Sequence, residues 1–186
     1  MIQSRFRTLA LAAAVTLCFA GMASAQTDSA APAAGTASGT AAMPADAAFV
    51  KMASAAGLAE VSLGKLGADK GQSDAVKTFG QSMVDDHTKA NDELKGIATS
   101  KSIPVSAAPM PADVKAASMI EKKDGTAFDT AFKTKMVADH EKVIKLFTKE
   151  SDSGKDADLK AFATKTLPTL KHHLEMAKAL PAGKQS

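Results

Sequence analysis

The sequence predicts an all-α protein, a ferritin-like antiparallel four-helix bundle with a long crossover between helices two and three. Long segments between residues 46 and 180 carry apolar residues at three- and four-residue spacing, which is typical of helices. No segment long enough to form a strand alternates apolar and polar residues. Two short links and one long link separate the predicted helices. Two hairpins joined by one long crossover have the connectivity of a ferritin-like bundle.

The first hairpin is predicted from its end signals. Helix one begins near Asp46, a good N-cap residue, and ends near Lys70, where Gly71 is available as a left-handed cap. Helix two begins at Ser73 as N-cap and ends near Ser100. The short link between the helices predicts that they pack side by side and antiparallel.

The crossover is predicted over residues 101–125, and it contains Pro104, Pro109 and Pro111. A short helix, residues 113–122, is expected inside it. This link is long enough to cross the whole length of the bundle.

The second hairpin follows the Asp-Gly turn signal that ends the crossover. Helix three begins with Thr126 and Asp129, which resemble a capping box, and it ends before Gly154. Helix four begins near Asp156 and contains Pro168, which removes a backbone hydrogen bond and is expected to kink it.

The N-terminal residues 1–25 have the pattern of a signal peptide. Arg5 and Arg7 form the positive start, an apolar run follows, and small residues precede a cleavage site after Ala25. The run is too short to span a bilayer. We therefore expect an exported protein, in the periplasm or secreted, whose single cysteine, Cys18, leaves with the signal peptide.

The mature chain has a composition that excludes several functions. Cleavage removes two arginines and lowers the formal net charge from +3 to +1, which leaves no arginine, tryptophan, tyrosine or cysteine. Nucleic-acid binding is not expected, because no basic stripe with stacking aromatics is present. No transmembrane segment is predicted in the mature chain. Residues 26–45 are expected to be a flexible tether rich in Ala, Thr, Ser, Gly and Pro, residues 46–180 the bundle, and residues 181–186 a tail.

A repeated phrase, Phe-x-x-x-Met-Val-x-Asp-His, ends at His87 in helix two and at His140 in helix three. Counted from the predicted helix starts, Glu60, His87 and His140 fall at equivalent mid-helix positions on apolar stripes. His173 falls about one turn, roughly 5 Å, from that level. These four residues are the predicted metal ligands.

Neutral imidazole and carboxylate groups together bind first-row transition metals, so one ion is expected, with copper, zinc, iron and manganese left open. A metal-free hydrogen-bonded network of the same buried residues is the alternative. A di-iron centre is not supported, because the chain contains no Glu-x-x-His pair. Met83 and Met136 lie one turn before the histidines, either as copper(I) ligands or as ordinary core residues.

Asp86 and Asp139 recur beside the two histidines. Each is expected either to orient a histidine of a neighbouring helix or to pair with a surface lysine. Glu141 and His172 are expected to face outward, with His172 as the reserve ligand if helix four is rotated by its proline.

These residues resemble a bacterial family, the domain-of-unknown-function family numbered 4142, described as ferritin-like and labelled an outer-membrane protein. The resemblance lies in residues 79–87 (FGQSMVDDH), residues 136–141 (MVADHE) and the Leu-Pro-Thr-Leu that precedes His173. Phe132 departs from the tyrosine expected there. The resemblance implies the fold and an exported location, and it implies no established activity.

The sequence supports three functional hypotheses. The first is a periplasmic bundle that stores or buffers a metal ion. The second is a non-enzymatic structural or stress-related module whose polar core sets the helix register. The third, an oxidase or peroxide-handling enzyme, has less support because the carboxylates for a second metal are missing.

Overall fold

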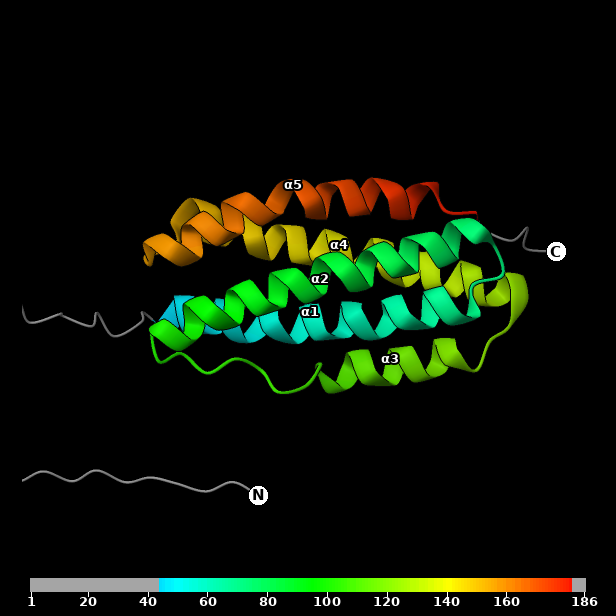
Figure 1. The fold of residues 1–186 in the computed structure, drawn as a ribbon, viewed down its shortest axis with the longest axis horizontal. Helices are drawn as coiled ribbons and strands as arrows, with labels where there is room; N and C mark the ends of the chain where they lie inside the picture. The colour runs from blue at the N-terminus through cyan, green and yellow to red at the C-terminus, as the bar shows by residue number, and fades with distance from the viewer. Residues whose placement is uncertain (1–43, 182–186) are drawn as a thin grey trace, which may run out of the picture. The chain divides into compact units, whose positions relative to one another are not determined.

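The computed structural model describes residues 44–181, and all of its regular structure there is helical (Figure 1). The helices are α1 (Pro44–Lys70), α2 (Asp74–Ser100), α3 (Pro111–Glu121), α4 (Gly125–Ser153) and α5 (Ala157–Ala179). The long helices pair as two hairpins, α1 with α2 and α4 with α5. The chain between α2 and α4 runs back along the bundle and carries α3 (Figure 1). The predicted fold class, including the long crossover, is confirmed.

Glycines let α1 and α2 approach closely. A Cβ atom on Gly80 would lie 2.6 Å from the carbonyl oxygen of Gly64 and 2.4 Å from the backbone nitrogen of Ala68. Real Cβ atoms do not come this near to backbone atoms, so the close contact requires a residue without a side chain at position 80.

Two of the predicted N-caps are confirmed. The Ser73 hydroxyl accepts a hydrogen bond from the backbone nitrogen of Val76 at 3.3 Å. The Asp156 carboxylate accepts from the backbone nitrogens of Asp158 and Leu159, at 3.0 and 3.1 Å. Each cap satisfies backbone donors that the first turn of a helix leaves without a partner.

The predicted roles of two other aspartates are wrong. Helix α1 begins at Pro44, so Asp46 is not its N-cap. The buried Asp46 carboxylate accepts hydrogen bonds from the backbone nitrogens of Lys155 and Asp156, at 3.0 and 3.1 Å. The aspartate therefore closes the loop between α4 and α5, on the other hairpin.

Asp129 does the same for the first hairpin. Helix α4 begins at Gly125, so Thr126 and Asp129 form no capping box. The Asp129 carboxylate accepts from the backbone nitrogens of Gln72 and Ser73, at 2.8 and 3.1 Å. We call Asp46 and Asp129 the loop clamps, since each holds the connecting loop of the opposite hairpin.

The left-handed cap predicted at Gly71 is also wrong. Among the described glycines only Gly125 has a positive φ, of 56°. A Cβ on Gly71 would lie 2.6 Å from the carbonyl oxygen of Gly67, so close packing is what favours glycine at this position.

The core consists of two apolar clusters with a polar layer between them. Along every long helix the chain passes from one cluster to the other at a buried polar residue. These residues are Glu60 on α1, His87 on α2, His140 on α4 and His173 on α5. The predicted ligands therefore occupy one layer across the bundle.

Among the described helices, α1 is long and apolar enough to cross a membrane by length and composition, with a mean hydropathy of 1.2 over its most apolar window. Of that window 56% is buried inside the bundle, as is usual for the core helix of a folded domain. The predicted signal peptide, most of the tether and most of the tail lie outside the described residues. Residues 44 and 45, assigned to the tether, are the first residues of α1.

Candidate metal centre

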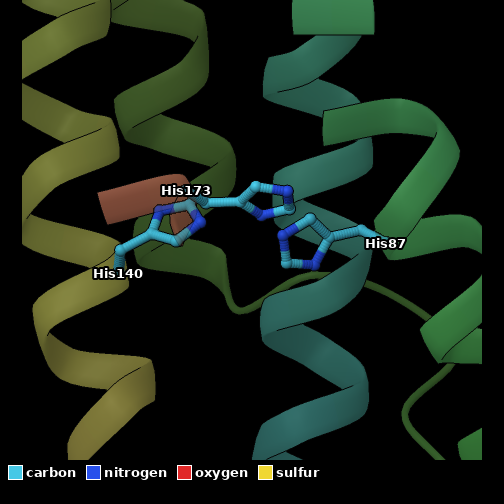
Figure 2. Close-up of side chains that lie close together, drawn as sticks. All are labelled: His87, His140 and His173. Carbon is cyan, nitrogen blue, oxygen red and sulfur yellow. The ribbon is translucent and has the colours of Figure 1, made fainter. Parts of the chain in front are cut away.

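Three histidines from three helices meet inside the bundle (Figure 2). One nitrogen from each of His87, His140 and His173 lies within 4.8 Å of the nitrogens of the other two. The ring centroids are 5.5 to 5.8 Å apart. Tetrahedral coordination with metal–nitrogen bonds of about 2.0–2.1 Å places ligand nitrogens about 3.3 Å apart, so the three nitrogens would have to move closer together by up to about 1.5 Å to coordinate one ion.

The backbone fixes the protonation of the His140 ring. Nδ1 lies 2.8 Å from the carbonyl oxygen of Met136, one turn earlier on α4. A carbonyl oxygen only accepts, so Nδ1 carries the proton and donates it. The lone pair of the neutral ring is therefore on Nε2, which is buried and has no hydrogen-bond partner.

A carboxylate fixes His173 in the opposite sense. Nε2 of His173 lies 3.0 Å from Oδ2 of Asp86 on α2, and the carboxylate accepts the proton that Nε2 donates. The free lone pair is then on Nδ1, which is also buried without a partner. A carboxylate that holds the far side of a histidine is the usual arrangement behind a metal ligand, because it orients the ring and raises its basicity.

Buried polar atoms normally have hydrogen-bond partners, and these rings break that rule together. His87 Nε2, His140 Nε2 and His173 Nδ1 are all without one. A self-contained network would have paired these nitrogens with one another or with a carboxylate. Each ring has one buried nitrogen without a partner, and the hydrogen bonds of His140 and His173 through their other nitrogens identify two of these as lone pairs.

The imidazoles are neutral at ordinary pH. Burial, with a smaller effect of His140 and His173, lowers the pKa of His87 to about 3. Burial also lowers the pKa of His140 to about 4, against the opposing effect of the Met136 carbonyl. For His173 burial lowers the pKa although Asp86 opposes it. Neutral imidazole is the form that binds a metal ion.

Glu60 belongs to the same layer without joining the three converging nitrogens. Its side chain is 2% exposed, and its Oε2 atom has no hydrogen-bond partner. Burial, followed by the charge of Asp139, raises the pKa of Glu60 well above its usual value. Glu60 and His87 both line a small pocket of about 20 Å³, which is room for about one water molecule or ion.

The His173 prediction was wrong in its level. His173 lies as close to His87 and His140 as they lie to each other, and not one turn away. The prediction required every helix to begin at the same distance from the site, but α5 begins more residues before His173 than α4 begins before His140. His172 and Glu141 are exposed, as expected. Pro168 lies within a continuous α5, and the predicted kink stays a prediction.

The two repeated aspartates have different roles. Asp86 orients His173, whereas Asp139 pairs with Lys135 at 2.6 Å. Met83 and Met136 are fully buried in an apolar cluster. The repeated phrase predicts the same two possible roles for both aspartates, and no spacing rule distinguishes them, because the partner of Asp86 comes from the other hairpin.

Comparisons with known proteins agree with this fold. The chain is similar to the crystal structure of a DUF305 fragment from Deinococcus radiodurans, with a TM-score of 0.66 and 10% sequence identity over 74% of this chain and 95% of that one. At this identity the likeness shows the fold alone. No curated protein matches the chain. A family profile described as "Domain of unknown function (DUF4142)" matches residues 31–180, and the chain therefore belongs to that family.

Proposed function

We propose that this protein is an exported metal-binding bundle that stores or buffers one transition metal ion. His87, His140 and His173 supply three imidazole ligands. Glu60 lies in the same layer but outside this group, and its carboxylate would have to move toward the ion to become the fourth ligand. The observation that carries the proposal is that three buried histidines, each from a different helix, bring one ring nitrogen apiece within 4.8 Å of the others. In support, each ring also has a buried nitrogen without a hydrogen-bond partner.

The donor set favours particular ions. Imidazole suits zinc, copper, iron and nickel, whereas manganese prefers oxygen donors. Three imidazoles with a carboxylate fit the tetrahedral geometry that zinc takes. We therefore expect zinc or copper to bind most tightly, and the absence of Glu-x-x-His pairs argues for one ion and not two.

Export is part of the proposal and rests on the sequence of residues 1–25. N-terminal sequencing of the protein isolated from cells tests it directly. The expected mature chain begins at Gln26, and a retained Met1 would contradict export by cleavage.

Metal content of the purified protein tests the central claim. Wild type prepared without chelator should carry about one zinc or copper ion per chain by elemental analysis, or take one up on titration. The variants His87→Ala, His140→Ala and His173→Ala should lose it. His172→Ala removes an exposed neighbouring histidine and serves as the matched control. A wild type that contains no stoichiometric metal and binds none on titration refutes the proposal.

One observation favours a second candidate, a structural module without metal. The polar layer separates two apolar clusters, and such a layer fixes how helices align along a bundle. This reading predicts that added metal leaves the melting temperature unchanged. The unpartnered nitrogens are its weakness, since a layer that serves only alignment would pair them.

A further inference from the structure

Helix α3 covers only part of the groove between α1 and α4. It contacts both helices and begins at Pro111. Beyond Met110 the groove stays open as a pocket of about 370 Å³. This is within the usual volume range of small-molecule sites.

The floor of this pocket is apolar. Its apolar lining residues are Met52, Ala56 and Ala59 on α1, Val143 and Leu146 on α4, and Met110 before α3. Met52 is 49% exposed and Met110 is 46% exposed, which is a large exposure for methionine side chains that flank one pocket. Contiguous exposed apolar surface of this kind commonly marks a binding site.

One side of the pocket is basic. Lys142, Lys145 and Lys149 line it from α4, at the three- and four-residue spacing that places side chains on one helix face. None of the three forms a salt bridge with any residue in the described range 44–181. The groove therefore presents three lysine side chains without a salt-bridge partner in the described range beside an apolar floor, and of these Lys142 acts at longer range on the Asp139 carboxylate.

The acidic end of the pocket is partly neutralised, because its two aspartates share one lysine. Asp113 and Asp139 both bind the ammonium group of Lys135, at 2.8 and 2.6 Å. Glu60 closes this end as a buried carboxyl group. A cation would meet repulsion from the lysines at the open side, whereas an anion would meet attraction there.

We propose that this groove binds a single-chain amphipathic anion, a long-chain carboxylate. The hydrocarbon chain lies along the floor between Met52 and Leu146, and the carboxylate lies among the lysines. A second recess of about 130 Å³ shares Met52, Leu146 and Lys149 with the pocket and extends it toward the α4–α5 loop, which gives room for a longer chain. This inference does not depend on metal binding.

A tryptophan reporter makes the test direct, because the chain contains no tryptophan or tyrosine. Met52→Trp places the reporter on the pocket floor, and Met119→Trp places it on an exposed position of α3 that does not line the pocket. Titration with monomeric laurate should shift the emission of the first variant to shorter wavelength in a saturable way and leave the second unchanged. Equal response of both reporters, or no response of the first, refutes the proposal.

The lysines are tested by charge reversal in the unlabelled protein, with binding measured by calorimetry. The triple variant Lys142→Glu, Lys145→Glu, Lys149→Glu should bind laurate at least tenfold more weakly. A control triple, Lys65→Glu, Lys77→Glu, Lys95→Glu, makes the same change in net charge on other exposed positions and should bind like wild type. Circular dichroism of both triples confirms that they are folded.

Two further ligands distinguish the chemistry. Dodecylamine has the same chain with a positive head and should bind more weakly than laurate. Equal binding of the two ligands, or equal weakening by both triples, contradicts the assignment of the carboxylate to these lysines. Binding seen only with anionic phospholipid vesicles, and not with monomeric laurate, would identify a membrane surface as the partner and overturn the proposal.

Discussion

Asp86 on α2 accepts a hydrogen bond from Nε2 of His173 on α5, with 3.0 Å between the two atoms. The contact joins the two hairpins at the polar layer. It also places the proton of the neutral His173 ring on Nε2 and the lone pair on Nδ1, so the affinity of the site for metal should depend on a residue that is not a proposed ligand.

Replacement of Asp86 by Asn should weaken metal binding about 10- to 100-fold. An amide can donate to Nε2, which would move the ring proton to Nδ1 and remove the lone pair from the site. Competition with a chromogenic chelator measures the affinity. Asp139→Asn is the control, because Asp139 has the same position in the repeated phrase but pairs with Lys135. Equal effects of the two substitutions would contradict the orienting role of Asp86.

Metal binding should release about one proton per ion at neutral pH if Glu60 is the fourth ligand. Burial raises the pKa of Glu60 well above its usual value, which favours the protonated carboxyl group in the metal-free protein, and a protonated carboxyl group must lose its proton to coordinate. Calorimetry in buffers of different ionisation enthalpy counts the protons. Glu60→Gln should reduce the count to near zero, and an unchanged count would exclude Glu60 as the source.

Chelation should lower the melting temperature of the loaded protein. An ion that binds only the folded state stabilises it by mass action, about 2.7 kcal/mol when its free concentration is one hundred times the dissociation constant. Differential scanning calorimetry with and without chelator measures the shift. His140→Ala, which lacks a ligand, should melt at the same temperature in both conditions.

Each loop clamp should contribute measurably to the free energy of unfolding, although the loop that it holds is short. Asp129→Ala leaves the backbone nitrogens of Gln72 and Ser73 without their acceptor, and the expected loss is about 1–3 kcal/mol of unfolding free energy. Urea denaturation measures it. Asp124→Ala removes an exposed aspartate whose side chain makes no cap bond and pairs with Lys70 at the surface, at 3.1 Å. Because exposed ion pairs contribute little, this control should change stability by less than about 0.5 kcal/mol.

Glu150 should give the protein a pH-dependent stability. Burial, together with Asp46 and Asp156, raises its pKa from 4.5 to about 7. Between about pH 4.5 and pH 7 the folded state therefore keeps a proton on Glu150 that the unfolded state has released. The free energy of unfolding of the wild type falls as the pH rises through this range. The free energy of unfolding of Glu150→Gln, relative to wild type, should increase over this range. Glu141→Gln, at an exposed position, should show no such trend.

Much of the fold could be predicted because it depends on local patterns. Helix type, the Ser73 and Asp156 caps and the long crossover follow from apolar spacing, capping residues and prolines. The polar layer was predictable for the same reason, since a histidine on an apolar stripe must be buried wherever the stripe is buried.

The remaining features depend on contacts between hairpins, which no local pattern encodes. Asp46 and Asp129 have the composition of ordinary helix starts, and only the assembled bundle shows that each serves the opposite loop. The level of His173 and the different roles of Asp86 and Asp139 are set by how far one helix slides along another. The pocket near Met52 exists because α3 begins only at Pro111 and leaves part of the groove between α1 and α4 uncovered. The sequence signals for the start of a helix do not show which surface the helix leaves exposed.

Because each loop clamp holds the loop of the opposite hairpin, the clamps affect how the protein unfolds. Asp46 and Asp129 are separated in the sequence by the same number of residues as Ser73 and Asp156. The two loops are therefore held by carboxylates at equivalent positions of the two hairpins. In each hairpin, the carboxylate that accepts hydrogen bonds from the loop backbone belongs to the other hairpin. Each hairpin therefore completes its loop hydrogen bonds only when it packs against the other hairpin. We expect the two hairpins to unfold together in one cooperative transition, without a populated intermediate in which one hairpin stays folded.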